Sequence, residues 1–120
     1  MKKVTFNDIP KIARNEALFT DTVYAQSILE HEDSDNFNFA IVNFPKSART
    51  KFHIHSGDQI LIITEGEGMV CNEEVELSVQ KGDMVLINAG ENHWHGAKEN
   101  TTMSHITITV SGSTTEVTED

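Results

Sequence analysis

Short apolar, β-branched runs alternate with turn signals along most of the chain. These runs lie at 22–29, 38–44, 50–54, 59–64, 68–72, 74–79, 84–87, 93–97 and 103–110. Gly, Pro, Ser and Asn residues separate them, and no later segment keeps a helical period of 3.6 residues. Many short runs of this kind are typical of an all-β sandwich or barrel. We therefore expect an all-β fold, with at most a turn or short helix at 8–18 after Pro10.

The length of the chain limits the number of domains. At 120 residues, 38% of them hydrophobic, it has room for one compact domain with one core. We place that domain at 1–110. The last residues, 111–120, have the sequence SGSTTEVTED. Their small and polar composition predicts a frayed polar C-terminal tail.

The charge argues against two classes of partner, and the cysteine count excludes an intrachain disulfide. The net charge is -10, with 19 acidic and 9 basic residues, which argues against nucleic acids and anionic membranes as partners. The single cysteine, Cys71, cannot form a disulfide within the chain. No apolar segment follows Lys2 and Lys3, so we expect no signal peptide, no transmembrane span and a cytoplasmic location.

The histidines form the most informative pattern in the sequence. Five of the six follow residue 50, and four of these form two His-x-His pairs, His53/His55 and His93/His95. Residues two apart on a strand point to the same face, so each pair projects together. A turn at 56–58 would bring Gln59 near the first pair. Converging neutral imidazoles suit manganese, iron, cobalt, nickel, copper or zinc.

A single His-x-His pair is weak evidence, because surface or core histidines explain one pair more often than a metal does. Two pairs, each next to a glycine-rich turn, favour a metal site. The fifth late histidine, His105, lies in a Thr/Ile-rich strand. From the residues alone, His105 is either a buried structural histidine or part of the functional site.

The spacing of these residues resembles the two motifs of the cupin superfamily. HIHSGDQILIITEG matches the first motif, G-x5-H-x-H-x3,4-E-x6-G, and GDMVLINAGENHWHGA matches the second, G-x5-P-x-G-x2-H-x3-N. The matching residues are His53, His55, Gln59 and Gly66 in the first motif, and Gly82, Gly90 and His93 in the second. The chain departs from the motifs at Ser47 for glycine, Gln59 for glutamate, Asn88 for proline and Ala97 for asparagine.

This resemblance covers about residues 40–110, with the motifs at 47–97, and implies a single-domain cupin barrel, a double-stranded β-helix or jelly roll. It also implies metal ligands at His53, His55, Gln59 and His93. His95 matches no ligand position, and we expect it to support the site from outside the ligand set. Glutamine donates oxygen without charge, which leaves a bound ion a stronger Lewis acid and favours Lewis-acid chemistry over chemistry with O2.

A narrower resemblance is to small bacterial cupins that include the manganese-dependent hydroxynitrile lyases. It is carried by Ala48-Arg49-Thr50, Gln59, the His93–Ala97 run HWHGA, and His105. It implies Mn²⁺, with Fe²⁺, Ni²⁺, Co²⁺ and Zn²⁺ as alternatives, and His105 as general acid/base. Ala40, Val42 and Thr50 would line the substrate pocket. The implied reaction cleaves or forms cyanohydrins of small apolar aldehydes.

Two other functions remain open. One is a metal-dependent cupin dioxygenase or oxidase, and the other is a non-catalytic cupin that binds a metal or a small ligand. In each case the expected partner is a small molecule. We also expect a homo-oligomer, a dimer or tetramer, because the first ~45 residues offer more strand than one barrel needs. Arg49 is expected to form a surface charge or salt bridge, and Trp94 to lie in the core or an interface.

Overall fold

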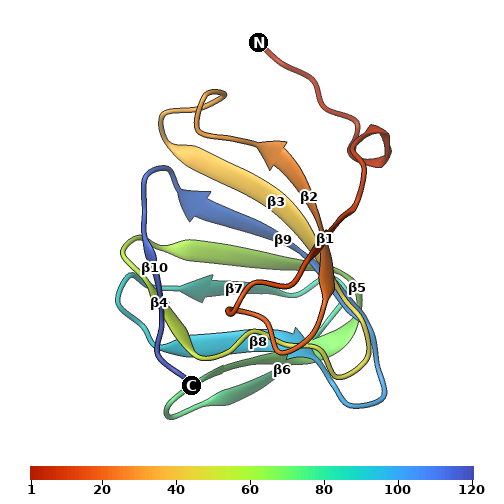
Figure 1. Ribbon diagram of the computed structural model, residues 1–120, viewed down its shortest axis with the longest axis vertical. Coiled ribbons are helices and arrows are strands. Elements are labelled where there is room, and N and C mark those ends of the chain that lie inside the picture. The colour runs from red at the N-terminus through yellow and green to blue at the C-terminus, as the bar shows by residue number, and fades with distance from the viewer.

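Ten strands and one short 3-10 helix make up the regular structure of the protein in the computed structural model, which describes residues 1–120 (Figure 1). The elements in chain order are η1 (Phe6–Asp8), β1 (Ile12–Arg14), β2 (Val23–Leu29), β3 (Phe37–Phe44), β4 (His53–His55), β5 (Gln59–Asn72), β6 (Glu76–Gln80), β7 (Met84–Ile87), β8 (His93–Ala97), β9 (Met103–Val110) and β10 (Thr115–Val117). The expected all-β class is confirmed. No helix is long and apolar enough to cross a membrane.

The strands curl into two facing layers that β5 connects (Figure 1). The first part of β5 pairs with β7 and β9, and its second part pairs with β6 and β8. The order β1-β2-β3-β9-β5-β8-β4-β10 follows the sheet around, and every ladder is antiparallel. This arrangement encloses one interior, toward which alternate residues of each strand point.

Most of the predicted runs coincide with strands. Strands β7, β8 and β9 have the predicted bounds of 84–87, 93–97 and 103–110. The runs at 59–64 and 68–72 are one continuous strand, β5, which contains a bulge between Ile63 and Glu65.

The expected helix at 8–18 and the expected frayed tail are both wrong. The only helical turn precedes Pro10, and Ile12–Arg14 is strand β1, which pairs with β2. This segment lacks a 3.6-residue apolar stripe, so pairing with a strand edge satisfies its backbone better than a helix would. In the tail, Thr115–Val117 pairs with β4, because the edge of that short strand offers unpaired backbone groups.

The hydrophobic core lies between the two layers, beside the cluster of histidines. Its ten buried residues come from strands all around the barrel and from the segment before β4: Val23, Phe44, Ala48, Leu61, Ile63, Val70, Val79, Ile87, Ala97 and Met103. These side chains fill one part of the interior, and polar side chains occupy the rest.

Two positions of the first motif have a backbone conformation that favours glycine. Gly66 has φ 70°, and a Cβ there would lie 2.0 Å from the carbonyl oxygen of Thr102. Ser47 has φ 68° and is the only non-glycine residue with positive φ. Ser47 stands where the first motif has glycine, so the chain keeps a glycine-type backbone conformation at this position.

Candidate metal centre

The candidate metal centre is formed where β4, β5 and β8 meet. His53 and His55 project from β4, Gln59 is the first residue of β5, and His93 is the residue of β8 that pairs with His53. The ring centroids of His53 and His93 are 4.2 Å apart, and those of His53 and His55 are 4.9 Å apart. One nitrogen from each of the three rings lies within 4.8 Å of the others. The structure therefore brings all four predicted ligands together.

Backbone carbonyls orient two of the three rings. Nδ1 of His53 lies 2.7 Å from the carbonyl oxygen of Lys51, and Nδ1 of His93 lies 2.8 Å from that of Glu91. A carbonyl only accepts, so each Nδ1 must carry the proton and each Nε2 has a free lone pair. This is the hydrogen-bond pattern that metal-binding histidines use.

Gln59 completes the donor set. Its Nε2 donates to Thr107 Oγ1 at 2.7 Å, which directs its Oε1 toward the histidines. That oxygen lies 3.1 Å from His93 Nε2, and both atoms present lone pairs. His55 Nε2 is buried without a hydrogen-bond partner. Lone pairs that converge in a buried site call for a cation, so three imidazole nitrogens and an amide oxygen fit a divalent metal ion.

Burial keeps the ligand histidines neutral. Burial, together with a smaller effect of the neighbouring His93, lowers the pKa of His53 to about 3 and that of His55 to about 4. Burial also lowers the pKa of His93. Neutral imidazole is the form that binds a metal, so the site is prepared for a cation at neutral pH.

The remaining two histidines of the cluster form a pair of their own. His95 is on β8 and His105 is on β9, and His95 Nδ1 lies 3.0 Å from His105 Nε2. The other two ring nitrogens, His95 Nε2 and His105 Nδ1, are buried without partners. Burial lowers the pKa of His105 to about 4 and the pKa of His95 well below its usual range. Two neutral rings therefore share one hydrogen bond, and the second nitrogen of each ring has no hydrogen-bond partner.

A cavity of about 300 Å³ adjoins both groups of histidines. His53, His55 and Gln59 border it together with His95 and His105, and the ring centroids of His53 and His95 are 5.5 Å apart. His93 is not among the residues that line the cavity. The three residues predicted for the substrate pocket all border the cavity: Ala40, Val42 and Thr50. Thr50 also accepts a hydrogen bond from the backbone N–H of His95.

Several lining residues were not predicted. Alternation along β9 would have placed Thr107 and Thr109 on the face of His105, and that signal was available in the sequence. Leu18 and Phe19 come from the segment before β2 and Thr115 from β10, so only the fold brings them to the cavity. Elsewhere, Arg49 forms the expected salt bridge, with Glu119.

Comparison with known proteins identifies the family. A model of the cupin domain matches residues 40–118, so the chain belongs to the cupin family. The fold and the resemblance inferred from the motifs are thereby confirmed. The match extends past residue 110 and includes strand β10.

Individual relatives add detail. The chain is 37% identical over 91 residues to an (R)-mandelonitrile lyase of Granulicella tundricola, covering 75% of this chain and 70% of that protein. A shorter match, 38% over 48 residues, is to an acireductone dioxygenase of Leptospira biflexa and covers 27% of that protein.

Among solved structures, a cupin-like protein of Thermotoga maritima superposes with TM-score 0.85 at 30% identity, covering 90% of this chain and 84% of that one. The polyketide cyclase RemF of Streptomyces resistomycificus superposes with TM-score 0.86 at 16% identity, covering 98% and 85%. At this identity the second similarity supports the fold alone.

Proposed function

We propose that this cupin is a metal-dependent lyase of the hydroxynitrile-lyase type, which cleaves or forms cyanohydrins of small apolar aldehydes. The observation that carries the proposal is that two adjacent histidine groups border one cavity. One is a donor set for a divalent ion, and the other is the His95–His105 pair, whose His95 ring lies 5.5 Å from that of His53. Similarity to a mandelonitrile lyase over most of both chains supports the same reaction.

The proposed roles of the site residues follow from the nitrogen and oxygen atoms that have a lone pair available. Three histidines and Gln59 would hold the ion, for which Mn²⁺ is our first candidate. When bound, a divalent ion supplies a Lewis acid that polarises an oxygen of the substrate. His105 Nδ1 would take the cyanohydrin hydroxyl proton, since its Nε2 can donate to His95 Nδ1 and leave a lone pair at Nδ1.

The reaction balances with that single proton. As the hydroxyl loses its proton to His105, the C–C bond breaks and its electron pair leaves with cyanide. An aldehyde remains, and the proton held at His105 passes to cyanide to give HCN. Because burial disfavours the charged ring, a protonated His105 would release its proton readily.

The cavity sets the expected size and polarity of the substrate. About 300 Å³ lies at the lower limit of typical ligand pockets, which favours a small aldehyde, for instance one with a single ring. Ala40 and Val42 give the β3 wall an apolar surface, and Phe44 packs against both rings of the His95–His105 pair.

The test is cyanide release from mandelonitrile by the Mn²⁺-loaded protein and its variants. We expect release by the parent protein and a loss of at least about 100-fold in kcat for His105→Ala, within the range for general acid–base catalysis. The same substitution at the exposed His31 should leave kcat unchanged. Loaded protein that releases no cyanide would overturn the lyase proposal and leave the metal centre standing.

The local match to an acireductone dioxygenase supports an oxygenase as a second candidate. Gln59 argues against it, because a ligand set without negative charge disfavours oxidation of the ion. Oxygen uptake with an enediol, thiol or phenolic substrate, without cyanide release from mandelonitrile, would favour the oxygenase. Bound metal without either activity, in parent and His105→Ala protein alike, would favour a binding module.

A further inference from the structure

Strand β4, which bears two of the proposed ligands, is weakly held by the rest of the barrel. It is three residues long and shares one residue pair with β8, His53 with His93. Its other edge pairs with β10 at three positions, including Thr115 with His55. Most of the ladder that fixes β4 therefore comes from the C-terminal segment, residues 113–119.

Contacts at both ends of β4 add to this ladder. At one end Ser56 N–H donates to the Thr114 carbonyl at 3.0 Å. The turn after β4 also packs so closely on the end of β9 that a Cβ at Gly57 would lie 2.8 Å from Val110 Cβ. At the other end Thr118 N–H donates to the Phe52 carbonyl at 2.9 Å.

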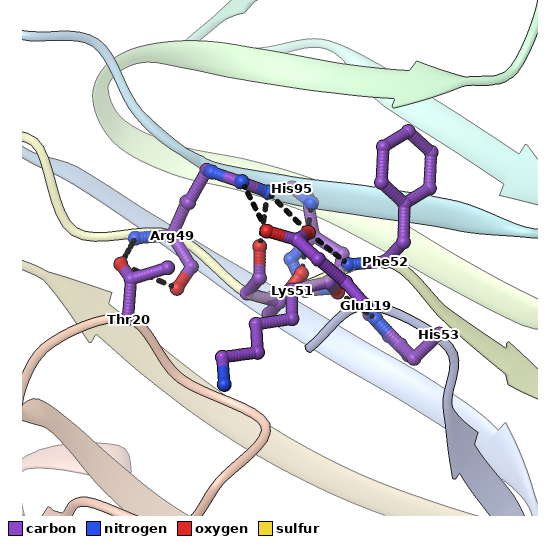
Figure 2. Close-up of polar contacts among 8 residues, drawn as sticks. Thr20, Arg49, Lys51, Phe52, His53, His95 and Glu119 are labelled. Carbon is purple, nitrogen blue, oxygen red and sulfur yellow. Dashed lines mark hydrogen bonds and ion pairs between the residues drawn. The ribbon is translucent and has the colours of Figure 1, made fainter.

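Glu119 anchors the end of the C-terminal segment, as Figure 2 shows. Its carboxylate accepts from Arg49 Nη2 at 2.9 Å and from the backbone N–H of Phe52 at 2.9 Å. The guanidinium of Arg49 also lies over the Trp94 ring, 4.7 Å from its centroid. Phe52 directly precedes His53, and Trp94 directly follows His93, so this ion pair braces the backbone beside two proposed ligands.

Thr115 makes a direct contact with a ligand side chain. Its Oγ1 lies 2.9 Å from His55 Nδ1. The other two ligand rings are oriented by backbone carbonyls, which no substitution removes. Only His55 depends on a side chain for this contact. When the hydroxyl accepts from Nδ1–H, the lone pair of His55 Nε2 points into the site, as a metal requires.

We propose that the C-terminal segment is a working part of the metal centre, in which Thr115 is the positioning residue that directs His55 Nε2 at the ion. This inference rests on the metal centre of the proposed function but not on the lyase reaction. It assigns a role to residues that the sequence pattern marks only as a polar tail.

The test is metal affinity, measured for Mn²⁺ and separately for Zn²⁺ by competition with a fluorescent chelator. We expect Thr115→Val to lose about 10- to 100-fold in affinity and Thr115→Ser to stay within about threefold of the parent, since outer partners of ligand histidines have effects of this size. The matched control is Thr5→Val, the same change at an exposed threonine outside the C-terminal segment, and it should retain the parent affinity. Thermal melting of the metal-free proteins checks that all variants fold.

A second readout addresses the ring itself. Long-range ¹H–¹⁵N spectra of the metal-free protein should show His55 protonated at Nδ1 in the parent and in Thr115→Ser, and mixed between Nδ1 and Nε2 in Thr115→Val. Equal metal affinity of parent and Thr115→Val would overturn this inference alone, as would an equal loss in Thr5→Val. Absence of metal binding in the parent would overturn the proposed metal centre and this inference together.

Discussion

The two faces of the sheet formed by β3, β9 and β5 have opposite character. Near the site, the inner face carries polar side chains, among them His105, Thr107 and Gln59. The outer face carries a contiguous set of apolar side chains: Phe39, Ile41, Ile60, Ile62, Ile106 and Ile108. An ordinary half-buried sheet has the reverse pattern, with apolar residues inside and polar residues outside. Polar groups on the buried face are costly, so their presence there indicates function.

The largest effect should follow from deleting a ligand on the inner face. We expect His93→Ala to weaken Mn²⁺ binding by well over about 100-fold, since loss of an outer partner alone costs up to that much. The measurement is chelator competition. His31→Ala removes an exposed histidine outside the site and should leave the affinity unchanged. Similar affinities for the two variants would contradict the assigned ligand set.

Acid should destabilise the inner face next. The pKa values of His53, His55 and His105 are depressed to about 3, 4 and 4, so the folded chain binds fewer protons than the unfolded chain below the usual value of 6.5. Stability should therefore fall as pH drops from 6.5 toward 4, by up to about 2 kcal/mol per such histidine at pH 5.

Urea unfolding of metal-free protein at pH 7 and pH 5 measures this loss. A protein that is equally stable at both pH values would contradict the burial of neutral histidines. His105→Phe removes one of these rings and should reduce the difference between the two pH values.

A smaller effect on Mn²⁺ affinity should follow from removing the hydrogen bond that orients Gln59. Thr107→Val removes the hydroxyl that accepts from the Gln59 amide, and we expect about a tenfold loss of Mn²⁺ affinity, the lower end for outer partners. Thr109→Val makes the same change at the residue that pairs with Gln59 in the ladder, whose hydroxyl accepts from Asn38 and not from the Gln59 amide. Equal affinity for both variants would show that the Gln59 amide needs no such support.

The sequence predicted the inner face of the site better than its supports. Spacing grouped the two His-x-His pairs and Gln59, because residues two apart share a face and a short turn returns the chain. The resemblance to the cupin motifs then selected His53, His55, Gln59 and His93 as ligands. Thr115 could not be predicted in this way, because it reaches His55 only through a ladder between segments 60 residues apart. Residues 12–14 form a strand for the same reason, since their partner edge on β2 decides their structure more than local propensity does.

Substitutions on the outer face should have the smallest effect on metal affinity. Phe6 of the same chain packs against Phe39 at one end of this face, and Ile41 is buried. We propose that a second copy of the chain covers the rest. At a net charge of -10, two copies repel over most of their surfaces, and this uncharged face is where they can meet. On β7, next to this face, Met84 and Leu86 are 61% and 52% exposed. Leu86→Lys should lower the mass found by light scattering to that of a monomer, with metal affinity unchanged, whereas Ser27→Lys on β2 should leave the mass as it was.

The metal content of the purified protein tests the central claim most directly. We predict one divalent transition-metal ion per chain by elemental analysis, removed by a chelator with a fall in melting temperature and restored by Mn²⁺. A protein that contains no such metal and whose melting temperature responds to none of Mn²⁺, Fe²⁺, Co²⁺, Ni²⁺ or Zn²⁺ would contradict this account of the inner face.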